Sequence, residues 1–202
     1  MKEVVIEYLK AKYHPRAMLV YGSYVREDQD EFSDFDCMLI VDEKVTNHDD
    51  TEIGGVKLDC FLFTADETVT EEPDTFLTAY DAEIVFDDGV GARLKDRVRQ
   101  YVEEHTKIDD SEKEFIASWI KKTMKRMQKG DDEGNYRAVA FLWESLTDYY
   151  LLRDMFYFGS KKAIQYLKQN DIRGYEYFYK AITLKTNDSI REWAEYVTGE
   201  RP

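Results

Sequence analysis

The sequence is poor in cysteine, proline and histidine, and it has no long apolar run. Of its 202 residues, 2 are cysteine, 3 are proline and 3 are histidine. The lack of a long apolar run excludes a transmembrane helix, and residues 1–9 lack the apolar core of a signal peptide. We therefore expect a cytoplasmic chain in which Cys37 and Cys60 are buried thiols. The histidines lack the spacing of zinc ligands.

Basic residues are also scarce. Lysine and arginine total 28 against 42 aspartates and glutamates, which gives a formal net charge of −14. A protein that grips duplex nucleic acid needs a basic face, and the first hundred residues show none. A negative field attracts cations and repels polyanions. The composition therefore favours a cationic small-molecule partner over nucleic acid or a membrane, although an acidic surface that serves only solubility is the alternative.

The first half of the chain has the pattern of a small mixed sheet with helices. The run from Ala17 to Tyr21 is apolar and is bounded by Pro15 and Gly22, which is typical of a buried strand. Further strands are predicted over residues 36–41, 56–63 and 82–86, and a charged amphipathic helix over 92–104. We expect residues 56–63 to pair with residues 36–41. Residues 1–108 are therefore predicted to form one α+β domain.

The second half is helical in pattern. Apolar residues recur at helical spacing from Phe115 to Met127, after a capping box formed by Ser111 and Glu114. Further helices are predicted over residues 138–158, 161–168, 174–184 and 189–197, with a break at 130–134. Residues 109–202 are therefore expected to form an all-helical bundle of four or five helices.

Three aspartates interrupt the apolar pattern of the first half. Asp34 and Asp36 stand two residues apart at the start of one predicted strand, and Asp59 lies inside the next. Carboxylates in apolar strands are costly unless a positive group meets them, and aspartate is disfavoured in strands. Two carboxylates on one face of an extended chain stay ionised only with a cation between them. We therefore predict a divalent metal site that holds a phosphate.

A small-residue turn precedes these aspartates. Gly22 permits a backbone turn that other residues resist, and Ser23 opens a segment whose backbone N–H groups could receive phosphate oxygens. Arg26 could brace this turn by pairing with a carboxylate, or it could be plain surface. Ordinary turn residues remain the alternative for Asp34 and Asp36.

The segments Tyr21–Arg26 and Ser33–Asp36, followed by Asp59, resemble the nucleotidyltransferase superfamily of DNA polymerase β. Within it, the chain is similar to small antibiotic nucleotidyltransferases, in which a helical domain follows the catalytic one. Many members have glycine after the arginine of the turn, whereas this chain has Glu27. The motif resemblance covers about 45 residues; the architectural one covers the whole chain more loosely.

The resemblance implies transfer of a nucleoside monophosphate, AMP from ATP, to a hydroxyl of an acceptor such as an aminoglycoside, with release of pyrophosphate. Asp34 and Asp36 would hold two Mg²⁺ ions, one of them shared with Asp59. Gly22 and Ser23 would hold the β and γ phosphates. The resemblance would make the enzyme an antibiotic-resistance factor whose nucleotide and acceptor share a cleft between the two domains.

Three features of the helical half are candidates for function. By the same resemblance, Glu144 would be the general base for the acceptor hydroxyl, with a surface glutamate as the equal alternative. Lys161 and Lys162 stand at a helix start, where lysine opposes the helix dipole, so they could contact the triphosphate or be solvated surface. Glu83 could be a fourth carboxylate near the site or a surface residue. The many aromatic residues could stack on nucleobases, but they are more typical of a bundle core or a dimer interface.

Two other functions stay open. The chain could resemble the minimal nucleotidyltransferases of toxin–antitoxin pairs, which modify a partner protein. It could also be a catalytically silent relative that binds a nucleotide or forms a homodimer. The sequence does not distinguish ATP from GTP, because both present the same triphosphate.

Overall fold

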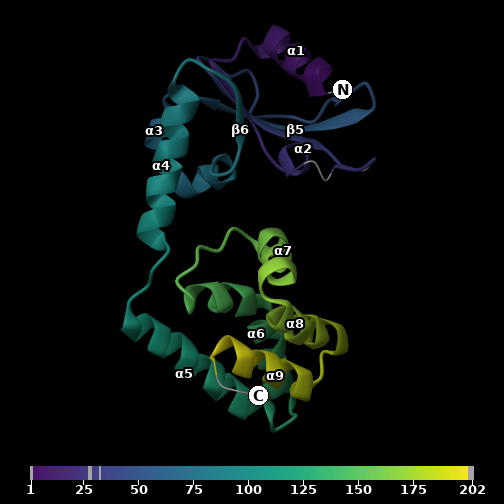
Figure 1. The fold of residues 1–202 in the computed structure, drawn as a ribbon, viewed down its shortest axis with the longest axis vertical. Coiled ribbons are helices and arrows are strands. Elements are labelled where there is room, and N and C mark those ends of the chain that lie inside the picture. The colour runs from purple at the N-terminus through teal and green to yellow at the C-terminus, as the bar shows by residue number, and fades with distance from the viewer. Residues whose placement is uncertain (1, 27–28, 32, 200–202) are drawn as a thin grey trace. The chain divides into compact units, whose positions relative to one another are not determined.

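The computed structural model describes residues 2–26, 29–31 and 33–199. It divides the chain into two compact units, Met1–Val102 and Glu103–Pro202, which are described one at a time (Figure 1). The first is a mixed sheet with helices and the second is helical, so the predicted α+β fold class is confirmed. No helix in the described part of the chain has the length and apolar character needed to cross a bilayer.

The sheet of the first unit joins parallel and antiparallel pairs of strands. Its strands are β1 (Ala17–Val20), β2 (Phe35–Val41), β3 (His48–Asp49), β4 (Glu52–Ile53), β5 (Val56–Thr64) and β6 (Glu83–Asp87). The strand order is β3-β5-β2-β1-β6, and β4 pairs with β5. The predicted pairing of residues 36–41 with 56–63 is confirmed: β2 and β5 run parallel, with Phe35 opposite Leu58 and Val41 opposite Thr64.

Side chains alternate between the two faces of this sheet. Along β5, Leu58, Cys60 and Leu62 are buried, and they share a core cluster with apolar residues of α1 (Lys2–Tyr13). The other face packs against α4 (Val90–His105), where a Cβ on Gly91 would lie 3.1 Å from the Cβ of Ala17. Short helices connect these layers: α2 (Ser23–Arg26), α3 (Glu67–Thr70) and the 3-10 helix η1 (Pro73–Ala79).

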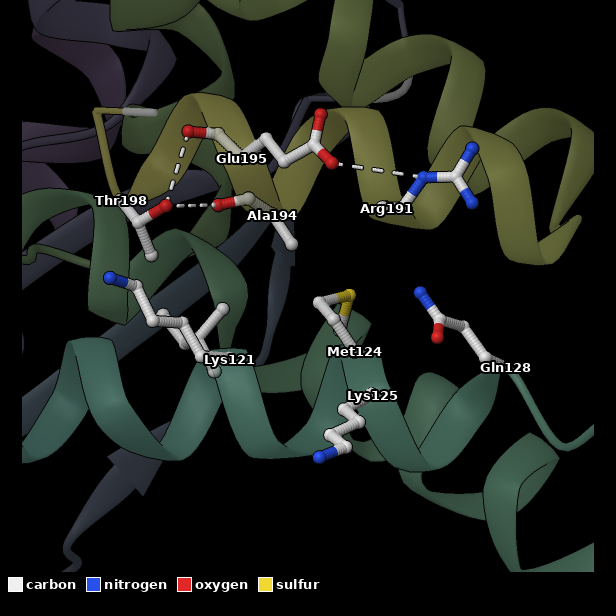
Figure 2. Close-up of a pocket in the computed structure, with 9 residues that line it drawn as sticks. Lys121, Met124, Lys125, Gln128, Arg191, Ala194, Glu195 and Thr198 are labelled. Atoms are coloured by element: carbon white, nitrogen blue, oxygen red, sulfur yellow. Dashed lines mark hydrogen bonds and ion pairs between the residues drawn. The ribbon is translucent and has the colours of Figure 1, made fainter. Parts of the chain in front are cut away.

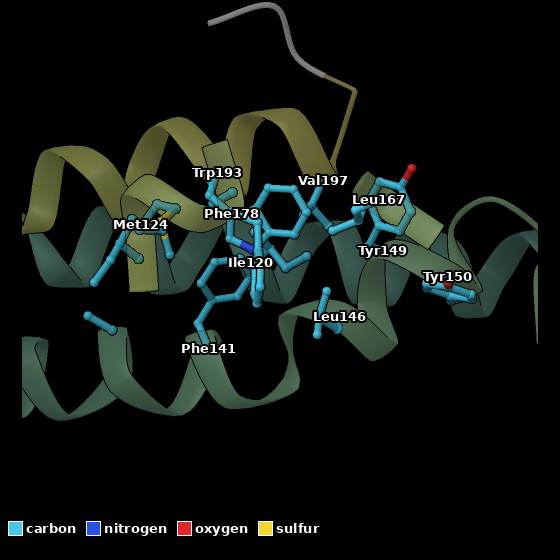
Figure 3. Close-up of a cluster of buried hydrophobic side chains, with 14 of the residues drawn as sticks. Ile120, Met124, Phe141, Leu146, Tyr149, Tyr150, Leu167, Phe178, Trp193 and Val197 are labelled. Carbon is cyan, nitrogen blue, oxygen red and sulfur yellow. The ribbon is translucent and has the colours of Figure 1, made fainter. Parts of the chain in front are cut away.

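The described part of the second unit contains the helices α5 (Asp110–Met127), α6 (Asp132–Leu151), α7 (Ser160–Asn170), α8 (Ile172–Leu184) and α9 (Asn187–Val197). Their apolar faces meet in one core, in which Phe141, Tyr149, Phe178 and Trp193 pack together (Figure 3). The ring planes of Tyr149 and Trp193 are stacked with centroids 5.8 Å apart. Several of the aromatic residues noted in the sequence therefore fill the bundle core.

Two predicted helix boundaries were wrong. The capping box of Ser111 and Glu114 does not form, because Asp109 is the N-cap of α5 and accepts from the N–H of Glu112 at 2.8 Å. The helix predicted over 138–158 instead spans Asp132–Leu151. It begins early because Asp131 accepts from the N–H of Gly134 at 2.8 Å and caps the helix, so the break predicted over 130–134 lies between Met127 and Asp132.

A buried carboxylate fastens α1 to the sheet. Asp49 is 5% exposed and accepts hydrogen bonds from Lys12 and Tyr13 at 2.8 Å each and from the Thr51 N–H at 3.0 Å. Burial raises the pKa of Asp49, but the hydrogen bonds from Lys12, Thr51 and Tyr13 outweigh it and lower the pKa well below the ordinary value. Folding therefore favours the ionised form of this carboxyl group.

We expect Asp49→Asn to lower the free energy of unfolding at neutral pH by about 1–3 kcal/mol, because it weakens a buried, charge-assisted contact. A carboxyl group with a depressed folded-state pKa stabilises the fold above its unfolded-state pKa of about 3.9, and this contribution is lost as pH falls towards the folded-state value. The deficit of the variant should therefore shrink in urea unfolding between about pH 7 and about pH 3. The control is Asp50→Asn, at an exposed neighbour; an Asp49→Asn deficit that does not change with pH would contradict this account.

Candidate active site

Asp36 and Asp59 lie side by side on neighbouring strands. They are direct partners in the parallel register of β2 and β5, where strands are separated by about 4.8 Å. Both side chains are half-buried. They point away from the face that packs on α1, because the alternate residues Cys37 and Cys60 belong to that core. The fold therefore places two carboxylates together on a partly open face of the sheet.

The glycine turn touches the first of these carboxylates. The Tyr21 N–H donates to the Asp36 carbonyl at 3.1 Å, so the end of β1 lies against the start of β2. Gly22 has φ +72°, and a Cβ built on it would stand 1.9 Å from Asp36 Oδ2. Glycine is therefore required here twice, for the backbone conformation and for the space that the Asp36 carboxylate occupies.

Ser23 and Arg26 belong to the short helix α2 that follows this turn. Ser23 begins the helix and is only 8% exposed. Arg26 ends it and is half-buried. Glu27, where the motif departs from its relatives, lies outside the described residues.

A histidine that the sequence reasoning did not single out contacts the second carboxylate. His48 Nε2 lies 2.7 Å from Asp59 Oδ1, and the His48 ring packs on Phe61 with centroids 4.7 Å apart. The contact follows from the pairing of β3 with β5, in which His48 is opposite Phe61. Because β3 has only two residues, it carries no alternating pattern by which its sequence could be recognised as a strand.

The cysteines beside the aspartates are buried thiols. Cys37 and Cys60 are free and buried, as the sequence predicted. A hydrogen bond to Cys60 and burial raise the pKa of the Cys37 thiol well above its ordinary value. The thiolate is the reactive form of cysteine, so these surroundings disfavour the reactive form of Cys37.

The third predicted carboxylate stands apart from the strand. Asp34 precedes β2 and is exposed. Within the described residues, no three His, Cys, Asp or Glu side chains are grouped so that they could hold a metal ion. Mg²⁺ in enzymes is commonly held by one or two carboxylates, with substrate phosphates and water completing its shell. The pair of Asp36 and Asp59 fits this requirement in donor type and placement, and the metal-ligand role of Asp34 stays a prediction.

The remaining predicted residues belong to other elements of the chain. Glu144 is exposed on α6, while Lys161 and Lys162 stand in the first turn of α7. Lys162 Nζ lies 4.9 Å from the centroid of the Phe158 ring. These residues belong to the second unit, and their roles in nucleotide transfer stay predictions. Glu83 is ion-paired with Lys2 at 2.7 Å.

One comparison with known proteins, the match to a family model, bears on the first unit. Residues 3–60 match the family model described as polymerase beta, nucleotidyltransferase, a span that contains Gly22, Asp36 and Asp59. The solved structures include a nucleotidyltransferase-like protein from Exiguobacterium sibiricum, which is 11% identical, with 98% of this chain and 73% of that chain covered and a TM-score of 0.37. No curated protein matches the chain. In the first unit, residues 3–60 are therefore similar in sequence to the nucleotidyltransferase domain of the polymerase β family.

Proposed function

We propose that this protein transfers a nucleoside monophosphate, AMP from ATP, to a hydroxyl group of a small cationic acceptor such as an aminoglycoside. A bond forms between the acceptor oxygen and the α-phosphorus, the α–β phosphoanhydride bond breaks, and pyrophosphate leaves. The observation that carries the proposal is the in-register pair of Asp36 and Asp59 beside the Gly22 turn, inside the matched segment.

The aspartate pair gives an electrostatic reason to expect a bound metal ion. Two carboxylates at the separation of neighbouring strands repel each other unless a cation lies between them. Asp36 and Asp59 would hold Mg²⁺, with Asp34 as a further ligand. When bound, the metal neutralises charge on the triphosphate and lowers the pKa of the acceptor hydroxyl. His48, at 2.7 Å from one oxygen of Asp59, leaves the other carboxylate oxygen for this role.

The turn would bring the triphosphate close to the aspartates. Without a side chain at Gly22, the backbone can come close to the Asp36 carboxylate, and the phosphates held there need the same close approach. Ser23 would donate its hydroxyl to the β and γ phosphates, and Arg26 would add positive charge. We keep Glu144 as the proposed acceptor of the hydroxyl proton and Lys161 and Lys162 as proposed triphosphate contacts.

The charge of the chain supports a cationic acceptor. With a formal net charge of −14, the protein attracts amines and repels polyanions. An aminoglycoside carries several ammonium groups beside its hydroxyls. It therefore offers both the positive charge that the protein attracts and a hydroxyl group that can accept the nucleotide. Proteins as acceptors are the alternative, and the same assay can include them.

A second candidate is Mg²⁺-dependent nucleotide binding without transfer. It is favoured by the absence of a third carboxylate grouped with Asp36 and Asp59 in the described residues. Titration calorimetry with a non-hydrolysable ATP analogue and Mg²⁺ would show binding in both cases. Only the enzyme would release pyrophosphate from ATP when the right acceptor is present.

We expect Asp36→Ala and Asp34→Ala each to lower the transfer rate by at least about 100-fold, because each removes negative charge that holds the metal and its phosphates. The assay uses labelled ATP and Mg²⁺ with a panel of aminoglycosides, lincosamides and candidate proteins, and it detects pyrophosphate and a product heavier by one nucleotide. Asp50→Ala, at an exposed position of the same unit, is the control, and circular dichroism checks the fold. An Asp36→Ala protein that is folded and fully active would rule out the assignment.

Gly22→Ala tests the turn against a matched glycine. A Cβ at Gly22 would displace the Asp36 carboxylate, whereas at Gly55, which has φ +85°, it would meet nothing within 4 Å. Both substitutions force alanine into a left-handed conformation, at about 1–3 kcal/mol of stability each. Only Gly22→Ala should also weaken binding of the Mg²⁺ complex of ATP, by about tenfold or more. Equal nucleotide affinity in the two variants, measured by calorimetry, would show that the turn does not serve the site.

A further inference from the structure

A small cavity in the second unit is lined by both acidic and aromatic side chains. It has a volume of about 290 Å³ and is lined by Phe115, Ile116 and Trp119 of α5 and by Glu144 and Asp148 of α6. A water molecule takes up about 30 Å³ in the liquid, so the cavity has room for a ligand of roughly ten non-hydrogen atoms. Its lining contains two carboxylates and no basic side chain.

Asp148 is the unusual residue of this cavity. It is 9% exposed, and its Oδ2 atom is buried without a hydrogen-bond partner in the described part of the chain. The other such atoms there are Arg126 Nη1 and Trp193 Nε1, which are donors. Buried polar atoms are nearly always hydrogen-bonded, so an orphan acceptor on a residue that lines a cavity points to a missing donor.

Other acidic groups of the same protein show what such a donor normally looks like. Asp49 accepts from Lys12, Tyr13 and Thr51. Asp171, between α7 and α8, accepts from the hydroxyls of Tyr149 and Tyr196 at 2.6 Å each. Asp148 is buried like Asp49 and more buried than Asp171, yet its Oδ2 has no such partner.

Charge near Asp148 is negative. Glu144 stands one helical turn before it, and side chains four residues apart share a face of a helix. Burial, and then the charge of Glu144, raise the pKa of Asp148 to about 7. Both effects penalise the ionised carboxylate, and a bound cation would relieve both.

The aromatic lining decides which cation fits. Trp119 is half-buried and Phe115 is exposed at the cavity, so a cation there meets ring faces as well as carboxylate oxygens. Ammonium groups bind favourably to aromatic faces, whereas Mg²⁺ keeps most of its water and prefers oxygen ligands. An organic amine can pair its charge with Asp148 and place its carbon skeleton against the rings.

A second cavity of the same unit provides a contrast. It measures about 370 Å³ and is lined by residues of α5 and α9, among them Lys121 and Lys125; Figure 2 shows Lys121 on the side of α5 that faces the helix carrying Arg191 and Glu195. The carboxylate in its lining, Glu195, already has a cationic partner, because it lies 3.7 Å from Arg191. Its lining is rich in cations, so the demand for an external cation is confined to the Asp148 cavity of these two.

We propose that the cavity formed by Phe115, Ile116, Trp119, Glu144 and Asp148 binds the ammonium group of a small organic amine, with Asp148 as the ionic partner and Trp119 as the aromatic wall. Because Glu144 is also the proposed acceptor of the hydroxyl proton, the inference deepens the proposed function and rests on it for its meaning as an acceptor site. Its test measures binding without turnover, so its failure can be told apart from a failure of nucleotide transfer.

The experiment titrates the full-length protein with benzylamine and, in parallel, with benzyl alcohol, its uncharged counterpart. Calorimetry measures affinity, and the indole N–H resonance of Trp119 in a ¹⁵N-labelled sample reports the place of binding. We expect saturable binding of benzylamine that shifts the Trp119 resonance, and binding of benzyl alcohol weaker by about tenfold or more. Equal affinities for the two compounds, or no saturable binding of benzylamine at millimolar concentration, would overturn the proposal.

Variants locate the interaction. Asp148→Asn keeps the size of the side chain and removes the charge, so it should lower the affinity for benzylamine by about tenfold or more. Glu144→Gln, at an exposed position, gives a second test that does not disturb the core. This substitution should lower the affinity for benzylamine by a smaller factor. Glu176→Gln removes an exposed acid of α8 and should change nothing. Unchanged affinity in Asp148→Asn, or a Trp119 shift produced equally by MgCl₂ alone, would show that the cavity is not an amine site.

Discussion

The parallel register of β2 and β5 is the constraint on which the first unit depends. It brings Asp36 and Asp59 to the same level of the sheet, and main-chain hydrogen bonds hold them there against their repulsion. One residue of slippage would turn the side chains of one strand to the other face, which would bury its aspartate in the core and expose its cysteine. The apolar cluster with α1 therefore fixes the site as firmly as it fixes the fold.

Neighbouring elements contact the pair of Asp36 and Asp59. The turn after β1 can lie against Asp36 because Gly22 has no side chain, and the hairpin that carries β3 brings His48 to Asp59. The same hairpin is fastened to α1 through Asp49. A contact that stabilises the fold and a contact that orients a carboxylate thus come from adjacent residues whose side chains point to opposite faces of the sheet.

Much of the first unit could be predicted from the sequence because strand periodicity, the glycine turn and the misplaced aspartates are local signals. The sequence could not reveal His48, since its partner is set by a two-residue strand. Nor could it reveal the exact ends of α5 and α6, which depend on whether Asp109 or Ser111, and Asp131 or a later residue, caps the first turn. Asp148 was missed for a different reason: among 42 acidic residues, nothing in a sequence marks the one that is buried without a donor.

Carboxylates in apolar surroundings follow one physical rule throughout this protein. Asp49 and Asp171 are satisfied inside their own units by lysine, hydroxyl and amide donors. Asp36 and Asp59 are held against each other on a half-open face of the sheet. Asp148 has a buried oxygen with no donor in the described chain. Because an uncompensated buried charge costs several kcal/mol, internal partners account for the first pair, whereas the unpartnered oxygen of Asp148 calls for a cation from outside. The aspartate pair has hard oxygen donors, which suit the metal–nucleotide complex proposed above, and the Asp148 cavity has aromatic walls, which suit an amine. The two units thus present different electrostatic demands, and each demand selects its own ligand chemistry.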